Sequence, residues 1–157
     1  MKHSIIVLLF SLLLNIPATL QAKTFDFEKM ADIEGVSSVH ISKAMFKLLS
    51  GMMGIEPDGI DLKSVMPKLE SIQIISCEKP NVIVRLKKEA EAFSTKEGYE
   101  ELMRVKEDDS RTIILQKLHK GKANEYVLIN TEGEDDFTLI LMKGTLTLEE
   151  LQQLTGK

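Results

Sequence analysis

The spacing of apolar residues divides the chain after residue 22 into strand-like and helical segments. Alternating apolar positions predict strands at 36–41, 71–77, 111–118, 125–130 and 137–142. Apolar residues three and four apart predict helices at 43–53, 80–93, 94–106 and 147–154, with short helical turns near 25–30 and 61–66. Two of these helices begin with a capping-box pattern, at Ser94 with Glu97 and at Thr147 with Glu150.

The order of these elements predicts the fold class. The last three predicted strands are separated only by short polar loops, at 120–123 and 131–136. Connections of this length join antiparallel neighbours. We therefore predict a single α+β domain over residues 23–157, built on a mainly antiparallel sheet of about five strands with helices packed on one face.

The first 22 residues have the pattern of a cleavable secretory signal peptide. Lys2 precedes an apolar run over residues 5–14, and Ala22 offers a small residue at the cleavage point. Because a membrane-spanning helix needs about 20 apolar residues, the run is too short for a stable anchor. No cysteine follows the run, so a lipoprotein is not expected. The sequence therefore predicts cleavage after Ala22 and a periplasmic or secreted product without stable membrane insertion.

Charge and cysteine content narrow the classes of partner and of stabilisation. The chain has 24 acidic and 20 basic residues and a net charge of −4. Because nucleic-acid binding needs a basic patch, we do not expect a nucleic-acid partner. Cys77 is the only cysteine, which excludes an internal disulfide. We expect Cys77 to be a small buried residue at a strand end. An intermolecular disulfide and a reactive thiol remain open alternatives.

The residues that could bind a metal lack the expected spacing. His40 and His119 lie on different predicted strands without a neighbouring ligand, and a zinc site needs three or four. Met45, Met52 and Met53 share one predicted helix, and thioethers suit Cu(I). These methionines coincide with the apolar stripe of that helix, so we expect them in the core. Copper binding is kept as a third hypothesis.

No segment matches a catalytic or cofactor motif. The acidic turn at 132–136 lacks the spacing of an EF-hand. The chain has no Gly-x-Ser-x-Gly elbow and no glycine-rich phosphate loop of standard spacing. We therefore predict no catalytic residue, no cofactor and no enzymatic activity. A carboxylate pair brought together only by the fold stays open.

Three segments resemble a known family. EGVSSVHISKAMFKLL (34–49), EGYEELMRVKEDD (97–109) and FTLILMKGTLTLEELQQL (137–154) are similar to domain of unknown function 4252, a family of small exported bacterial proteins common in Bacteroidetes. The resemblance covers nearly all of the chain after residue 22. It implies a Gram-negative envelope and an α+β fold, and it brings no catalytic residues. Family genes beside extracytoplasmic sigma-factor regulators further imply a role in envelope signalling or stress.

Two function hypotheses follow from export without an active-site motif. The first is a non-enzymatic envelope protein that binds another protein through the uncovered sheet face and the edge strands. Tyr126 and Phe137, with strand 137–142, are its candidate contact residues, and burial in the sheet core is their alternative role. The second is a small-ligand carrier or weak enzyme with a pocket between helices and sheet. It requires a concave site with converging polar groups.

Overall fold

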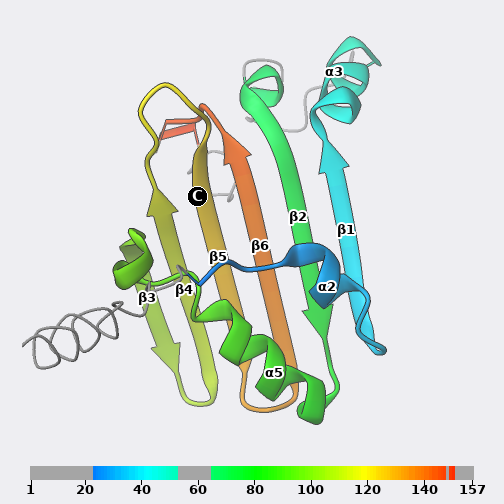
Figure 1. Cartoon of the computed structure of the whole chain (residues 1–157), viewed down its shortest axis with the longest axis vertical. Coiled ribbons are helices and arrows are strands. Elements are labelled where there is room, and N and C mark those ends of the chain that lie inside the picture. The colour runs from blue at the N-terminus through cyan, green and yellow to red at the C-terminus, as the bar shows by residue number, and fades with distance from the viewer. Residues whose placement is uncertain (1–22, 53–64, 148, 151–157) are drawn as a thin grey trace, which may run out of the picture.

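The computed structural model describes residues 23–52, 65–147 and 149–150 (Figure 1). The predicted signal peptide, the helical turn at 61–64 and the end of the last predicted helix lie outside the described residues. The helical elements are α2 (Phe27–Ala31), α3 (Lys43–Met52), α5 (Pro80–Ala90) and the 3₁₀ turns η1 (Met66–Lys68) and η2 (Thr95–Glu97). In the described part of the chain, no helix combines the length and hydropathy needed to cross a membrane.

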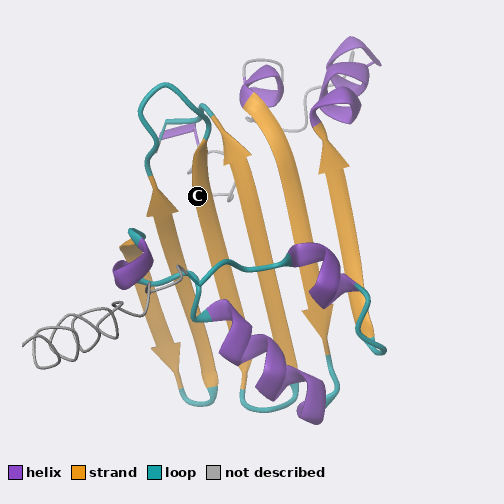
Figure 2. Cartoon of the chain, viewed as in Figure 1, coloured by secondary structure: helices purple, strands orange, loops and turns teal. Residues whose placement is uncertain are grey.

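Six strands form one antiparallel sheet in the order β1-β2-β6-β5-β4-β3 (Figure 2). The strands are β1 (Val36–Ser42), β2 (Leu69–Cys77), β3 (Glu100–Glu107), β4 (Ser110–Lys117), β5 (Asn124–Glu132) and β6 (Asp136–Gly144). The α+β class and the antiparallel sheet are confirmed. The sheet has one strand more than the five predicted, because β3 replaces a predicted helix.

The predicted helix at 94–106 is wrong. Its first residues form only η2, which ends at Gly98 with φ of 86°, a left-handed conformation that stops a helix. The Ser94 side chain makes no capping hydrogen bond. The register with β4 then shifts between Glu101 and Met103, a bulge that interrupts the alternation of side chains along β3. The apolar spacing of a bulged strand therefore imitates that of a helix.

The main core lies between one face of the sheet and α5. Pro80 opens α5 at a position where its missing N–H is not needed. The helix then buries Val82, Ile83 and Leu86 toward the sheet. These side chains share a core with Ile75 of β2, Val127 of β5 and Leu139 of β6. Each of these three strand residues is fully buried. In Figure 1, α5 and α2 both lie across this face.

A second, smaller core lies at one end of the opposite face. Its buried members are Phe46, Val65, Leu69, Tyr126 and Leu146. Tyr126 alternates with Val127 along β5, so the two side chains point to opposite faces of the sheet. The helices are therefore not confined to one face as predicted, because α3 contributes Phe46 to this second core.

Candidate functional site

Strand β1 forms one edge of the sheet, and its outer side pairs with no described strand. None of the residues from Val36 to Ser42 is charged or proline. The strand pairs with β2 over its whole length without a register shift. Its middle is exposed, with Val39 at 49 % of its full accessibility. A regular, uncharged edge presents free backbone N–H and C=O groups to which another strand can pair.

The middle of the sheet face away from α5 carries little charge. One row of paired residues crosses all six strands with apolar side chains, namely Val39, Ile74, Ile140, Leu128, Ile114 and Met103. The flanking rows are Ile41, Ile72, Met142, Tyr126, Gln116 and Glu100 on one side and Ser37, Ser76, Thr138, Asn130, Thr112 and Val105 on the other. Glu100 is the single charged member of these three rows. We call this surface the apolar face.

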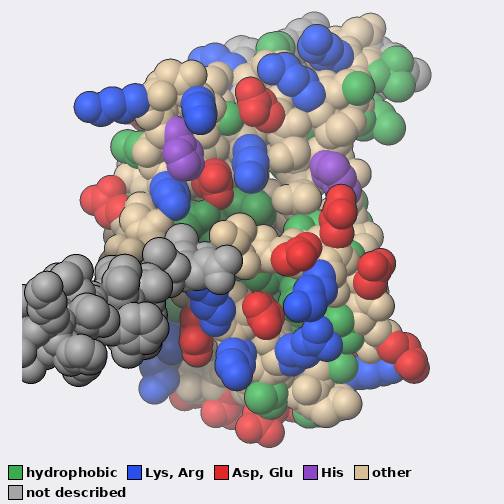
Figure 3. All heavy atoms as spheres, in the orientation of Figure 1, with side chains coloured by type: hydrophobic (Ala, Val, Ile, Leu, Met, Phe, Trp, Pro, Cys, Tyr) green, Lys and Arg blue, Asp and Glu red, His purple; other side chains and the backbone are tan. Residues whose placement is uncertain are grey.

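The face that carries α5 has a different character. Figure 3 shows Lys and Arg side chains mixed with Asp and Glu over this side of the molecule. Charged residues also dominate β3, the other edge of the sheet, whose sequence is EELMRVKE. Charged side chains and a bulge are the features by which edge strands avoid pairing with other chains. The two edges of the sheet are therefore unequal.

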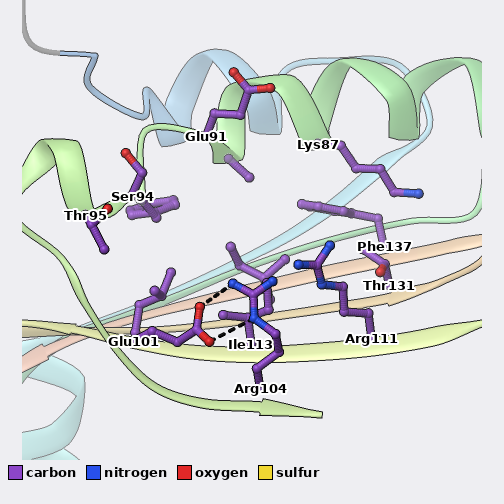
Figure 4. A pocket seen from close by; sticks show the side chains of 14 residues that line it. Lys87, Glu91, Ser94, Thr95, Glu101, Arg104, Arg111, Ile113, Thr131 and Phe137 are labelled. Carbon is purple, nitrogen blue, oxygen red and sulfur yellow. Dashed lines mark hydrogen bonds and ion pairs between the residues drawn. The ribbon is translucent and has the colours of Figure 1, made fainter. Parts of the chain in front are cut away.

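A cavity of about 490 Å³ opens between the end of α5 and strands β3, β4 and β5. Its apolar walls come from Ala90, Phe93, Ile113, Leu115, Ile129 and Phe137. Lys87, Glu91, Ser94, Thr95, Glu101, Arg104, Arg111 and Thr131 complete the lining. Figure 4 shows the guanidinium groups of Arg104 and Arg111 rising from the sheet toward α5. The cavity thus has an apolar floor and a charged rim.

The three cationic side chains at the rim of the cavity differ in their hydrogen-bond partners. Arg104 makes two hydrogen bonds to the Glu101 carboxylate, and these bonds hold the pKa of Glu101 below its ordinary value. Lys87 donates to the backbone carbonyl of Gly133 at 2.7 Å. Among the described residues, Arg111 has neither an ion pair nor a side-chain hydrogen bond. The cavity therefore contains one guanidinium group that no described side chain engages.

A partly buried polar cluster lies beyond the cavity, around Glu125 of β5. The Tyr99 hydroxyl donates to Glu125 Oε2 at 2.7 Å, His119 Nε2 lies 3.2 Å from Oε1, and Lys143 Nζ lies 3.8 Å away. Burial acts to raise the pKa of Glu125, but Tyr99, Lys143 and His119 together hold it below its ordinary value. Burial first, then Glu125, raises the pKa of Tyr99. The cluster therefore holds a stable carboxylate and a neutral phenol, which are poor acid–base catalysts near neutrality.

The two candidate contact residues both lie inside the molecule. Tyr126 is 4 % exposed and donates from its hydroxyl to the Leu146 carbonyl at 2.8 Å. Phe137 is fully buried beneath α5, in the main core. They lie on opposite faces of the sheet. Tyr126 shares a face with Met142, its partner on β6, and Met142 lies an odd number of residues from Phe137 along that strand. As surface residues they are corrected: each contributes to a core.

The cysteine, histidine and methionine residues singled out in the sequence lie at separate places in the described structure. Cys77 is buried at the end of β2, as expected, and accepts a hydrogen bond from the Lys79 N–H at 3.4 Å. His40 is exposed on β1 and His119 contacts Glu125, so the histidines do not share a site. Met45 is 46 % exposed, so the prediction that it lies in the core is wrong, and Met53 lies outside the described residues. In the described ranges, no group of three His, Cys, Asp or Glu residues is placed to hold a metal.

The cavity was missed because the helix prediction at 94–106 hid the hairpin that builds it. In the β3–β4 register, Arg104 pairs with Ile113 and Lys106 pairs with Arg111. Pairing therefore places three cations on one face of two strands. The signal was the sequence Asp108-Asp109 between two strand-forming segments, which is a hairpin turn rather than the end of a helix.

A comparison with family models assigns the chain to one family. The model of the family described as domain of unknown function (DUF4252) matches residues 27–154. The chain therefore belongs to this family, and the resemblance seen in the three segments is confirmed. Comparisons with curated proteins and with solved structures gave no match.

Proposed function

We propose that the protein is a non-enzymatic binding protein of the cell envelope that pairs an extended segment of another protein with β1. The observation that carries this proposal is the contrast between the two sheet edges. Strand β1 is regular and uncharged, whereas β3 carries charges and a bulge. Strand addition obtains affinity from main-chain hydrogen bonds and specificity from alternate side chains.

The surroundings of β1 define the chemistry of the partner segment. Val39 and Ile41 lie at the margin of the apolar face, which continues from them across β2 and β6. On the other side of β1, Ser38 and His40 are exposed and polar. A matching segment is therefore extended and uncharged, with apolar residues at alternate positions that continue the apolar face.

The compartment and the biological role form part of the proposal. Residues 1–22 support export, and the absence of a cysteine after the apolar run supports a product free in the envelope space. A binding protein of this kind suits envelope signalling or a stress response, in which a partner segment is exposed or withdrawn.

The test compares two exposed valines on the apolar side of the two edges. Val39 on β1 and Val105 on β3 are 49 % and 38 % exposed. The native protein, Val39→Lys and Val105→Lys would each be immobilised and exposed to envelope extract, and retained proteins identified by mass spectrometry. A lysine on an edge strand opposes pairing. We expect one partner that is retained by the native protein and by Val105→Lys but is lost with Val39→Lys.

The same experiment separates the edge from the face. Loss with both variants would assign binding to the apolar face instead of β1. Equal retention by all three proteins would contradict the proposal. A partner that passes this test is then purified, and its affinity for the three proteins is measured directly. Self-pairing would show as a dimer in analytical ultracentrifugation that Val39→Lys abolishes.

A second candidate function is the binding of a small ligand in the cavity beneath α5. This function requires a concave site with converging polar groups, and the cavity combines both features. Its volume of about 490 Å³ suits a small organic molecule. The two functions use opposite faces of the sheet, so one molecule can serve both.

A further inference from the structure

The cavity beneath α5 joins two chemically different halves. Ile113 and Ile129 line its floor from adjacent strands, and Phe93 lines it from the segment after α5. Arg111 and Lys87 stand at its rim from the sheet and the helix, respectively. A ligand that satisfies both halves needs an apolar body and an anionic end, because cations bind anions and the floor offers no polar partner.

The cations exceed the carboxylates at this rim, although the chain as a whole is acidic. Arg104 is paired with Glu101, and Glu91, the residue after α5, is paired with Lys23 at 3.3 Å. Arg111 and Lys87 are left without a carboxylate partner among the described residues. Lys106 adds charge nearby, since it pairs with Arg111 in the β3–β4 register.

We propose that this cavity binds an amphiphilic carboxylate, with its carboxylate group on Arg111 and Lys87 and its hydrocarbon chain over Ile113 and Ile129. This inference rests on the second candidate function and names its ligand class. A guanidinium group binds a carboxylate through two parallel hydrogen bonds. Glu91 and Glu101 line the same cavity, so a singly charged group meets less repulsion there than a doubly charged phosphate.

Three eight-carbon probes of equal length test the requirement for an anion. Octanoate, 1-octanol and octylammonium share a hydrocarbon chain and end in an anionic, a neutral and a cationic group, respectively. Each would be titrated into the full mature chain and followed by the backbone amide shifts of β3, β4 and α5. We expect octanoate to bind, octanol to bind at least about tenfold more weakly, and octylammonium not to bind, since a charge-assisted hydrogen bond contributes about that factor.

Two pairs of variants locate the site. Arg111→Gln removes the unpaired cation, and Arg85→Gln removes an exposed cation of α5 that does not line the cavity. Ile113→Gln makes the floor polar. Ile114→Gln makes the same change one residue along β4, on the apolar face. We expect about tenfold weaker octanoate binding for Arg111→Gln and Ile113→Gln, and native affinity for the other two.

The outcomes distinguish the ligand class from the cavity itself. If octanol binds as tightly as octanoate and both are weakened by Ile113→Gln, the cavity is a ligand site but the carboxylate assignment is overturned. If Ile114→Gln weakens octanoate and Ile113→Gln does not, the ligand lies on the apolar face and the inference fails. If no probe shifts the amides of β3, β4 and α5, both the inference and the small-ligand function are overturned.

Discussion

The two edge strands of the sheet, β1 and β3, differ in how well their free backbone N–H and C=O groups can pair with another strand. Strand β1 keeps a regular register with β2 and contains serines, a histidine and aliphatic residues. Strand β3 has a bulge between Glu101 and Met103 and places charged residues along most of its length. Both edges belong to one sheet and have the same antiparallel pairing. The difference therefore lies in the side chains and in the bulge, and not in the topology.

This contrast shows how one sheet supports two kinds of binding. An edge without charges is a liability in a free protein unless another chain uses it. The charges of β3 protect that edge, and on the side of α5 they also form the rim of the cavity. The β1 edge is therefore suited to a protein segment, and the β3 side to a small anionic ligand. The following predictions test whether the two halves are one folding unit and which contacts hold the β3 side.

The largest effect is expected from truncation of the core near either edge. Ile75 of β2 lies toward β1 and Leu115 of β4 lies toward β3, and both are buried in the main core. Ile75→Ala and Leu115→Ala should each lower the free energy of unfolding by about 2–5 kcal/mol. Because one core joins both halves, each variant should still unfold in a single transition. Urea unfolding followed by circular dichroism measures both quantities.

Hydrogen exchange measures, strand by strand, how each core variant changes local stability. If Leu115→Ala accelerated exchange only in β3 and β4 and left β1 and β2 at the native rate, the halves would be separate units. The comparison between edges would then be one between two independently stable regions.

An intermediate, pH-dependent effect is expected at Tyr99, which precedes β3 and reaches Glu125 of β5. Tyr99→Phe removes a hydrogen bond to a charged group and should cost about 1.5–3 kcal/mol at neutral pH. The pKa of Glu125 is lowered in the folded state, so its contribution is present above the ordinary carboxyl pKa and is lost as pH falls through the lowered value. The stability difference between native and Tyr99→Phe should therefore shrink below about pH 4.5.

Tyr126→Phe is the matched control for this pH dependence. The Tyr126 hydroxyl donates to the Leu146 carbonyl, a group that does not titrate. The variant should cost about 0.5–1.5 kcal/mol, with the same difference from native at pH 7 and at pH 4. Urea midpoints measured across this range compare the two variants. A Tyr99→Phe difference that stayed constant with pH would remove Glu125 from the explanation.

The smallest effect is expected at the turn that holds β3 to β4. Asp108 has a φ of 42°, a left-handed conformation that is energetically unfavourable for a residue with a side chain. Asp108→Gly should therefore raise the stability by about 0.5–1 kcal/mol. Asp109→Gly is the control, because Asp109 is not in this conformation and glycine there adds only chain entropy. Equal effects at both positions would show that the strain at Asp108 is not what limits the turn.

Much of the fold was predictable from local patterns. The strands at 36–41, 71–77, 111–118, 125–130 and 137–142 and the helices at 43–53 and 80–93 are close to β1, β2, β4, β5, β6, α3 and α5. The capping box at Thr147 is also present, since Thr147 N–H donates to Glu150 and Glu150 N–H donates to Thr147. These elements follow short-range periodicity and capping chemistry, which single segments carry by themselves.

The features that depend on pairing were not predictable in the same way. The bulge in β3 made its spacing resemble a helix, so the sixth strand and the cationic rim of the cavity were missed. Tyr126 and Phe137 are candidate contact residues in the sequence, with burial in the sheet core as the alternative, and the packing of α3 and α5 against opposite faces buries them. Which side of a strand is covered depends on distant segments, and one sequence window does not contain that information.

Local patterns and residue counts are enough to show most of the strands and helices, the excess of acidic residues and the single cysteine that excludes an internal disulfide. The tertiary structure decided the order of strands, and with it the identity of the edges. It also decided that Arg104 and Arg111 meet above an apolar floor while an uncharged row crosses the opposite face. The physical reason is that strand pairing sets the register, and the register decides which side chains share a face.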